Sequence, residues 1–268
     1  MNLAKRYLIK PGSKVKLARF DTSDNGGLEK EAALPLIEKN VGRLDDLQYL
    51  LYAENKRALL VVLQAMDAAG KDGAIRRVMA GFDPLGCHVT SFKVPSEEER
   101  EHDFLWRVHQ HVPRKGEIAI FNRSHYEDVL VVRVKNFVPK EVWSRRYEQI
   151  NAFEKHLADN GATIVKFFLH ISKAEQKERL QARLDDPVKH HKFNLGDLAE
   201  RKNWDKYMAA YADALAQCST PWVPWYVVPA DRKWYRNLVI SQVLIETLEG
   251  LKMQLPKVDF DPQKVRVE

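Results

Sequence analysis

"ALLVVLQAMDAAGKDGAIRRV", residues 58–78, places a mostly apolar run, a glycine-containing loop and a helix-like repeat one after another. The run over residues 58–64 is too short for a stable helix and matches a strand buried on both faces. Helical spacing begins in "GAIRRVMAGF", residues 73–82. The stretch therefore predicts a strand, a loop and a helix in that order.

The loop resembles the phosphate-binding (Walker A) pattern G-x-x-x-x-G-K-[ST], but Ala65 and Asp72 replace the first glycine and the hydroxyl residue. A loop between a buried strand and a helix directs backbone N–H groups and the helix dipole at an anion. Gly70 and Gly73 permit close approach of the backbone, and Lys71 supplies a mobile charge. A purely structural turn is the alternative, and we favour phosphate binding.

Two carboxylates in this loop are unusual, because they would repel a phosphate unless a cation lies between them. Mg²⁺ commonly uses one or two carboxylates together with substrate phosphates. Asp67 is the stronger candidate ligand. Asp72 is explained equally well as an acid that complements the dipole at a helix N-terminus.

Strand-like and helix-like segments alternate along the rest of the chain. Further strands are predicted at residues 87–92, 117–121, 163–171 and 224–230, and helices at 32–52, 96–112, 139–160, 172–184 and 234–253. Two of these helices begin with predicted capping boxes, Ser96 with Glu99 and Ser172 with Glu175. The alternation predicts a parallel sheet with helices on both faces, in a single domain over residues 1–268 with an N-terminal extension over about 1–56.

Residues 184–216 are too long for a tight connection and are rich in charged and aromatic residues, which predicts a lid. A cationic stretch surrounds its start: Arg179, Arg183, Lys189, His190, His191 and Lys192. Most of these residues are expected on a solvated face. Arg183 differs, because it ends the helix that leads into the lid, where an arginine can stabilise a transferring phosphoryl group.

"FNRSHYED", residues 121–128, follows the third predicted strand. Ligands of open parallel sheets sit beyond the carboxyl ends of the strands, so Asn122 and Arg123 should face the loop. A guanidinium there can grip phosphate oxygens in a bidentate manner. The alternative is that Arg123 pairs with Glu127 or Asp128 on the surface.

The composition is that of a globular protein. Of 268 residues, 45% are hydrophobic and 30% charged, and no run approaches the roughly 20 apolar residues of a membrane span. We expect a cytoplasmic protein, because the N-terminus lacks the apolar core of a signal peptide and the two cysteines have no metal-ligand spacing. The net charge of +6 suits a groove for a polyanion or, alternatively, a generally basic surface.

The assembled motifs resemble polyphosphate kinase family 2. The resemblance is carried by "LLVVLQAMDAAGKDGAIRRV", "IFNRSHYEDVLVVRV", "RLDDPVKHHKF", "GDLAERKNWDKY" and "PWYVVPADRKWYRN". It implies a P-loop kinase, thymidylate-kinase-like α/β/α sandwich with a helical lid, and Mg²⁺-dependent phosphoryl transfer between polyphosphate and nucleotides, with Mn²⁺ as an alternative ion. The altered loop is then the family's own version, in which acids replace the hydroxyl residue.

The resemblance also implies roles for single residues. Four match the family's catalytic positions: Asp67, Lys71, Arg123 and Arg183. Contacts to phosphate or polyphosphate are expected from Ala69, Gly70, Lys71, Asp72, Gly73, Arg76, Lys189 and Lys192, and contacts to the nucleotide from Arg123, Glu127, Asp128 and Arg133. The expected metal ligands are Asp67, Asn122 and Glu127.

One position departs from many relatives. Asn122 stands where they have an aspartate, and Glu127 where they often have an asparagine. Either residue could complete the metal site. The exchange resembles the subgroup that accepts both nucleoside mono- and diphosphates and makes ATP from AMP in two steps.

The expected partners are polyphosphate, nucleoside mono- and diphosphates and further copies of the chain in a dimer or tetramer, with neither nucleic acid nor membrane. Two other functions are weighed against this one. An ATP-dependent nucleoside monophosphate kinase would share the sheet and the loop. A non-catalytic polyanion-binding module would explain the charge but gives Asp67 beside Lys71 no purpose.

Overall fold

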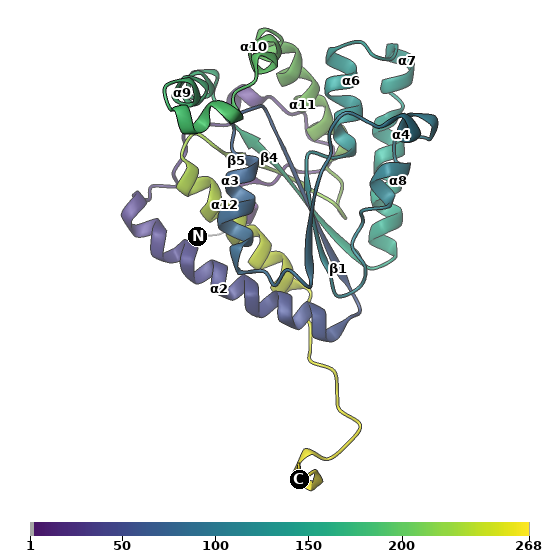
Figure 1. The fold of residues 1–268 in the computed structure, drawn as a ribbon. Helices are drawn as coiled ribbons and strands as arrows, with labels where there is room; N and C mark the ends of the chain where they lie inside the picture. The colour runs from purple at the N-terminus through teal and green to yellow at the C-terminus, as the bar shows by residue number, and fades with distance from the viewer. Residues whose placement is uncertain (1–2, 268) are drawn as a thin grey trace.

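The computed structural model describes residues 3–267, and its centre is a five-stranded parallel sheet (Figure 1). The strands are β1 (Ala58–Ala65), β2 (Cys87–Ser91), β3 (Ile118–Asn122), β4 (Ala162–His170) and β5 (Trp225–Pro229), in the order β2-β3-β1-β4-β5. All four pairings are parallel, with Val61 opposite both Ile120 of β3 and Val165 of β4. The five predicted strands and the parallel sheet are confirmed.

Helices cover both faces of this sheet. One face carries α2 (Lys30–Glu54), α3 (Lys71–Val78) and α12 (Lys233–Gly250), and the other carries α6 (Val131–Val134), α8 (Arg146–Asp159) and α11 (Trp204–Cys218) (Figure 1). The short helix α1 (Leu3–Tyr7) packs against α12 and β5. The predicted three-layer sandwich is therefore confirmed.

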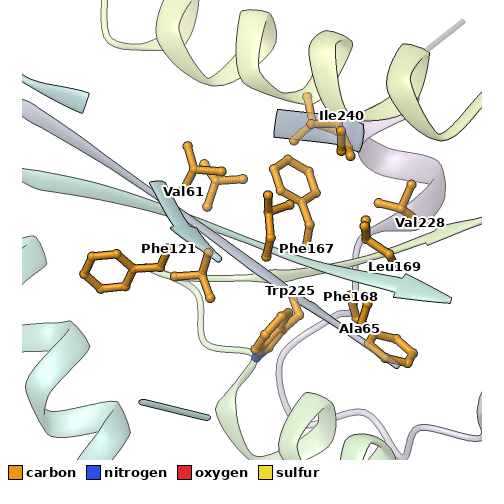
Figure 2. Close-up of a cluster of buried hydrophobic side chains, with 14 of the residues drawn as sticks. Val61, Ala65, Phe121, Phe167, Phe168, Leu169, Trp225, Val228 and Ile240 are labelled. Atoms are coloured by element: carbon orange, nitrogen blue, oxygen red, sulfur yellow. The ribbon is translucent and has the colours of Figure 1, made fainter. Parts of the chain in front are cut away.

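The core lies between the sheet and these two helical layers. Every residue of β1 is buried, as expected for a central strand covered on both sides. Figure 2 shows how the layers alternate along β4: Phe167 and Ile240 of α12 lie on one side of the sheet. Phe168 points to the opposite side, where its ring centroid is 4.4 Å from that of Tyr211 in α11.

The sheet order brings two loops together. The connection after β1 leads to α3 on one face, whereas the connection after the neighbouring β3 leads to η3 (His125–Val129), α6 and α8 on the other. Adjacent parallel strands whose connections leave to opposite faces form a crevice at their carboxyl ends, where ligands bind. The loop over residues 66–70 and the residues after β3 therefore share one crevice.

Three details of the predicted helices are wrong. The expected helix over 96–112 is divided into α4 (Glu97–Glu101) and α5 (Trp106–His109), because the Asp103 side chain accepts the N–H of Leu105 at 2.9 Å and favours a turn. The expected helix over 139–160 is likewise divided into α7 (Lys140–Trp143) and α8.

The third detail concerns the caps. Ser96 and Glu99 form the full capping box. Ser172 accepts the N–H of Glu175 at 3.0 Å, but the N–H of Ser172 donates to Asp231 instead, so the second box is incomplete.

The segment predicted as a lid contains two different parts. After α9 (Lys173–Leu184), the 3-10 turn η4 (Pro187–Lys192) and α10 (Leu195–Lys202) contain no buried residue. The helix α11 that follows is buried along one side and belongs to the core. Among the described residues, no helix has the length and apolarity needed to cross a membrane.

Candidate active site

The loop between β1 and α3 forms the floor of the crevice. Helix α3 begins at Lys71, and the residue that caps it, Gly70, has a φ of 102°, a conformation that glycine adopts without strain. The first N–H groups of a helix have no partner within it, so those at the start of α3 are free to bind an anion. The predicted strand, loop and helix are present in the predicted order.

Lys71 lies inside the loop rather than out in solvent. Its ammonium group donates to the carbonyl of Ala65 at 3.1 Å, and the side chain is buried. Burial, and then the charge of Arg123, lower the pKa of this ammonium, although Asp67, Glu127 and Asp72 act in the opposite direction. The three carboxylates and two cations therefore share one electrostatic environment.

Arg123 turns back toward the loop. Its backbone has a φ of 64°, and its N–H donates to the carbonyl of Leu63 at 3.0 Å. The guanidinium donates to Asp67 Oδ1 at 2.9 Å. Burial lowers the pKa of this group, but the carboxylates of Glu127 and Asp67 outweigh burial and raise the pKa overall. Arg123 thus pairs with Asp67 across the crevice and not with Glu127 or Asp128 on the surface.

Asn122 joins the end of β3 to the start of α3. Its amide nitrogen donates to Asp72 Oδ1 at 2.8 Å, so Asp72 has a partner across the crevice as well as a place in the first helical turn. The amide oxygen of Asn122 is not used in this bond. Carboxylate and amide oxygens from both sides of the crevice are therefore within reach of one ligand.

Glu127 lies beneath the same cluster. The side-chain amide of Gln64, oriented with its nitrogen toward Glu127, donates to Glu127 Oε1 at 3.0 Å. Burial raises the pKa of the Glu127 carboxyl, although Arg123 and Lys71 oppose it. Glu127 is thus a half-buried acid whose carboxyl pKa depends on burial and on the two neighbouring cations.

Two expected nucleotide contacts have ion-pair partners of their own. Asp128 accepts from Arg146 at 2.8 Å, and Arg133 donates to Asp213 at 2.7 Å while its guanidinium lies 4.5 Å from the ring centroid of Trp143. The structure does not bring these two side chains into the Asp67 cluster. Arg76 is exposed on α3.

Asp128 supports a prediction about pH. Burial raises the pKa of its carboxyl from 3.8 to about 6, against the charges of Arg146 and Arg107. A raised folded-state pKa means that protonation stabilises the fold, so stability falls as pH rises from about 4 to about 6. Relative to Asp128→Asn, the wild type should lose roughly 2 kcal/mol of unfolding free energy over this interval. Denaturant titrations at pH 4, 5, 6 and 7 measure the difference, and parallel profiles for the two proteins would contradict it.

The lid carries a further acid above the crevice. Arg183 donates to the carbonyl of Lys192 at 2.9 Å and to Asp197 Oδ2 at 3.4 Å. The pKa of Asp197 is raised by burial and then by Asp67, while Arg183, Arg123 and Lys71 lower it. The first turn of α10 therefore faces the loop. Lys189 pairs with Asp186 at 2.6 Å, and Lys192 is exposed.

Comparison with known proteins shows which family the chain belongs to. The family model of polyphosphate kinase 2 matches residues 28–256, most of the chain. The chain belongs to the polyphosphate kinase 2 family. It is therefore an enzyme, a kinase with the three-layer α/β/α fold described above, and the resemblance drawn from the motifs is confirmed. Neither an ordinary ATP-dependent monophosphate kinase nor a non-catalytic polyanion-binding module is favoured.

Individual members of the polyphosphate kinase 2 family match along nearly the full chain. An AMP/ADP-polyphosphate phosphotransferase from Meiothermus ruber is 56% identical over 266 residues, with 98% of this chain and 100% of that protein covered. An ADP-polyphosphate phosphotransferase from Rhodopseudomonas palustris is 48% identical, with coverage of 94% and 92%. The crystal structure of polyphosphate kinase 2 from Arthrobacter aurescens superposes with a TM-score of 0.95 at 45% identity, with coverage of 98% and 94%.

Sequence reasoning misses two groups beside the polyphosphate kinase 2 loop. Asp197 stands in the "GDLAER" stretch of the lid, and its only signal is an acid in the first turn of a charged helix. Arg179 and Arg236 contact the back of the loop, where both donate to the carbonyl of Ala69. Nothing in the spacing of these arginines along the chain brings them to one carbonyl.

Proposed function

We propose that the protein transfers phosphoryl groups between polyphosphate and adenine nucleotides, converting AMP to ADP and ADP to ATP. The observation that carries this proposal is the Asp67–Arg123 pair facing Lys71 at the end of a phosphate loop that lacks the usual hydroxyl residue. The exchange of Asn122 and Glu127 supports the use of both nucleotides, as does the name of the Meiothermus ruber relative.

In this reaction, an oxygen of the nucleotide's terminal phosphate attacks the terminal phosphorus of polyphosphate in line. The new P–O bond forms as the P–O–P bond to the rest of the chain breaks, and the shortened polyphosphate leaves with the electron pair. Little covalent chemistry is required of the protein, so positioning and charge neutralisation provide the rate enhancement.

The cationic side chains divide this work. Lys71 and the N–H groups at the start of α3 hold the oxygens of the transferred group. Arg123, fixed by Asp67, faces the same oxygens from the other side of the crevice. Arg183 reaches the group from the end of α9, beside the lid, and stabilises charge that develops during transfer.

The oxygen ligands of the crevice suit Mg²⁺. Asp67 and Asn122 each have an oxygen outside the bonds described above, and Glu127 lies beneath them. Among residues 3–267 no three acids, histidines or cysteines cluster as a metal site, so a bound Mg²⁺ would need phosphate oxygens and water to complete its shell. When bound, Mg²⁺ would neutralise phosphate charge, and Mn²⁺ has the same ligand preferences. A cytoplasmic location and a homo-oligomeric state remain predictions.

The choice of donor tests this function. Purified protein with Mg²⁺ is given AMP together with either long-chain polyphosphate or ATP, and nucleotides are separated over time. We expect ADP and then ATP to accumulate with polyphosphate. Turnover with ATP as the sole effective donor would assign the protein to the ordinary nucleotide kinases instead.

Lys192 provides a prediction about the polyphosphate path. If this exposed lysine lines the path, Lys192→Ala should raise the polyphosphate KM about two- to fivefold at low salt, the range of one surface ion pair. The effect should shrink at high salt because screening already weakens the contact. Lys189→Ala is the comparison variant, since Asp186 already neutralises that ammonium. An unchanged KM for Lys192→Ala at low salt would remove this residue from the path.

A further inference from the structure

A buried arginine without an acidic partner lies directly behind the phosphate loop. Arg236, near the start of α12, is 2% exposed. It donates to two neutral acceptors, Asn237 Oδ1 at 2.8 and 3.2 Å and the Ala69 carbonyl at 3.1 Å. Among residues 3–267 no carboxylate forms an ion pair with it. Burial and then the charge of Arg179 lower its pKa to about 10.

Arg179 approaches the same part of the loop from α9. Its guanidinium donates to the carbonyls of Ala68 and Ala69 at 3.1 and 2.9 Å, and to those of Ala230 and Asp231 at the end of β5. Only Arg179 has an acid partner, Glu175 at 2.7 Å. Two guanidinium groups thus bind the Ala69 carbonyl, but only one carboxylate, that of Glu175, pairs with either of them. One positive charge behind the loop is therefore left unbalanced.

One glycine of the loop, Gly70, makes room for this arginine. A Cβ atom on Gly70 would lie 2.0 Å from Arg236 Nη1, and one on Gly73 would lie 3.5 Å from Nη2. Figure 1 shows the helices concerned, α3 and α12, side by side on one face of the sheet. Gly70 therefore admits a guanidinium from behind as well as a phosphate from in front, whereas a Cβ atom on Gly73 would make only an ordinary van der Waals contact with Arg236.

The contact also determines where one amide points. In a trans peptide the C=O and the following N–H point in opposite directions. Because the Ala69 carbonyl is held by the two arginines, the N–H of Gly70 is directed away from them. Among the described residues this N–H has no acceptor, so it is available to a phosphate oxygen.

We propose that Arg236 is a positioning residue for polyphosphate, a proposal that rests on the proposed function. Together with Arg179, Arg236 fixes the Ala69–Gly70 peptide and supplies positive charge that bound polyphosphate balances. Arg236 does not touch the substrate, because the loop covers it. Its effect should therefore appear in polyphosphate binding and not in nucleotide binding.

Two variants test the role of this arginine. Arg236→Gln removes the charge. Arg236→Lys keeps the charge but loses the planar guanidinium that donates to two acceptors at once, so the second variant remains informative if the first fails to fold. For each, we expect a polyphosphate KM raised about tenfold or more, with the AMP KM within about twofold of wild type. The rise in melting temperature caused by tripolyphosphate without nucleotide should shrink or disappear.

Arg107→Gln is the matched control. Arg107 is also buried, at 6% exposure. Its guanidinium donates to the carbonyl of Lys93 and to the carboxylate of Glu99, away from the loop. This change should lower the melting temperature and leave the tripolyphosphate shift intact. Arg236 variants that behave like this control would overturn the proposal and make Arg236 structural only. If wild type itself shows no polyphosphate-dependent turnover, the proposed function fails, independently of the variants.

Discussion

Asp67→Asn is expected to lower turnover with polyphosphate and AMP at least about 100-fold, the loss typical of one preorganised electrostatic group. The Asp67 carboxylate fixes Arg123 and offers its second oxygen to a divalent ion. The neutral amide of the Asp67→Asn variant would bind both the guanidinium and the ion more weakly. The fold should tolerate the change, because the pair it breaks is partly exposed and such pairs contribute about 1 kcal/mol or less. Steady-state turnover and thermal melts provide the two measurements.

Two further measurements separate metal binding from simple destabilisation. The Mg²⁺ concentration for half-maximal rate should rise for Asp67→Asn, whereas Asp205→Asn, a change at an exposed acid in α11, should leave it unchanged. A large fall in melting temperature that accounts for the lost activity would instead assign Asp67 a structural role.

The edge of the sheet that carries the site is predictable from sequence, because all strands of a parallel sheet end at the same edge and ligands bind beyond those ends. The carboxyl ends of β1 and β3 carry Asp67, Lys71 and Arg123, and a parallel sheet must bring adjacent carboxyl ends together. What local patterns cannot provide is the pairing of side chains across the crevice. Asp67 with Arg123, and Asp72 with Asn122, are separated by 56 and 50 residues.

Buried polar groups are the other part that sequence patterns miss. Lys166 interrupts the apolar run of β4, yet it is fully buried and donates to Glu154 at 2.5 Å and to the hydroxyl of Tyr126 at 2.7 Å. These bonds tie the segment after β3 to β4 and α8. A lysine or arginine is mostly exposed unless it is paired, and only tertiary structure supplies the partner. Arg236 also escapes prediction, because its acceptor on the loop, the Ala69 carbonyl, reaches it only in the tertiary structure.

Arg183→Ala should lower kcat by about 10²–10⁵-fold, between the loss of one electrostatic stabiliser and the loss of an arginine finger. The Arg183 side chain is about one-quarter exposed and is held by the Lys192 carbonyl and Asp197 at the lid, so it is oriented before substrate arrives. Charge that develops only during transfer affects the rate and not ground-state binding. The AMP KM should therefore change little, and initial-rate measurements over both substrates separate the two constants.

Arg183 also helps to hold the lid, so a lid control is required. Arg201, on α10, donates to the Lys173 carbonyl and to Gln176, and so anchors the lid to α9. Among the described residues it forms no bond with Asp197. Arg201→Ala should loosen the lid and raise both KM values with a smaller effect on kcat. If Arg201→Ala lowers kcat as much as Arg183→Ala, lid closure and not the Arg183 charge limits the rate. Near-normal turnover of Arg183→Ala would place this arginine outside the transition state, leaving Lys71 and Arg123 to neutralise the transferred group.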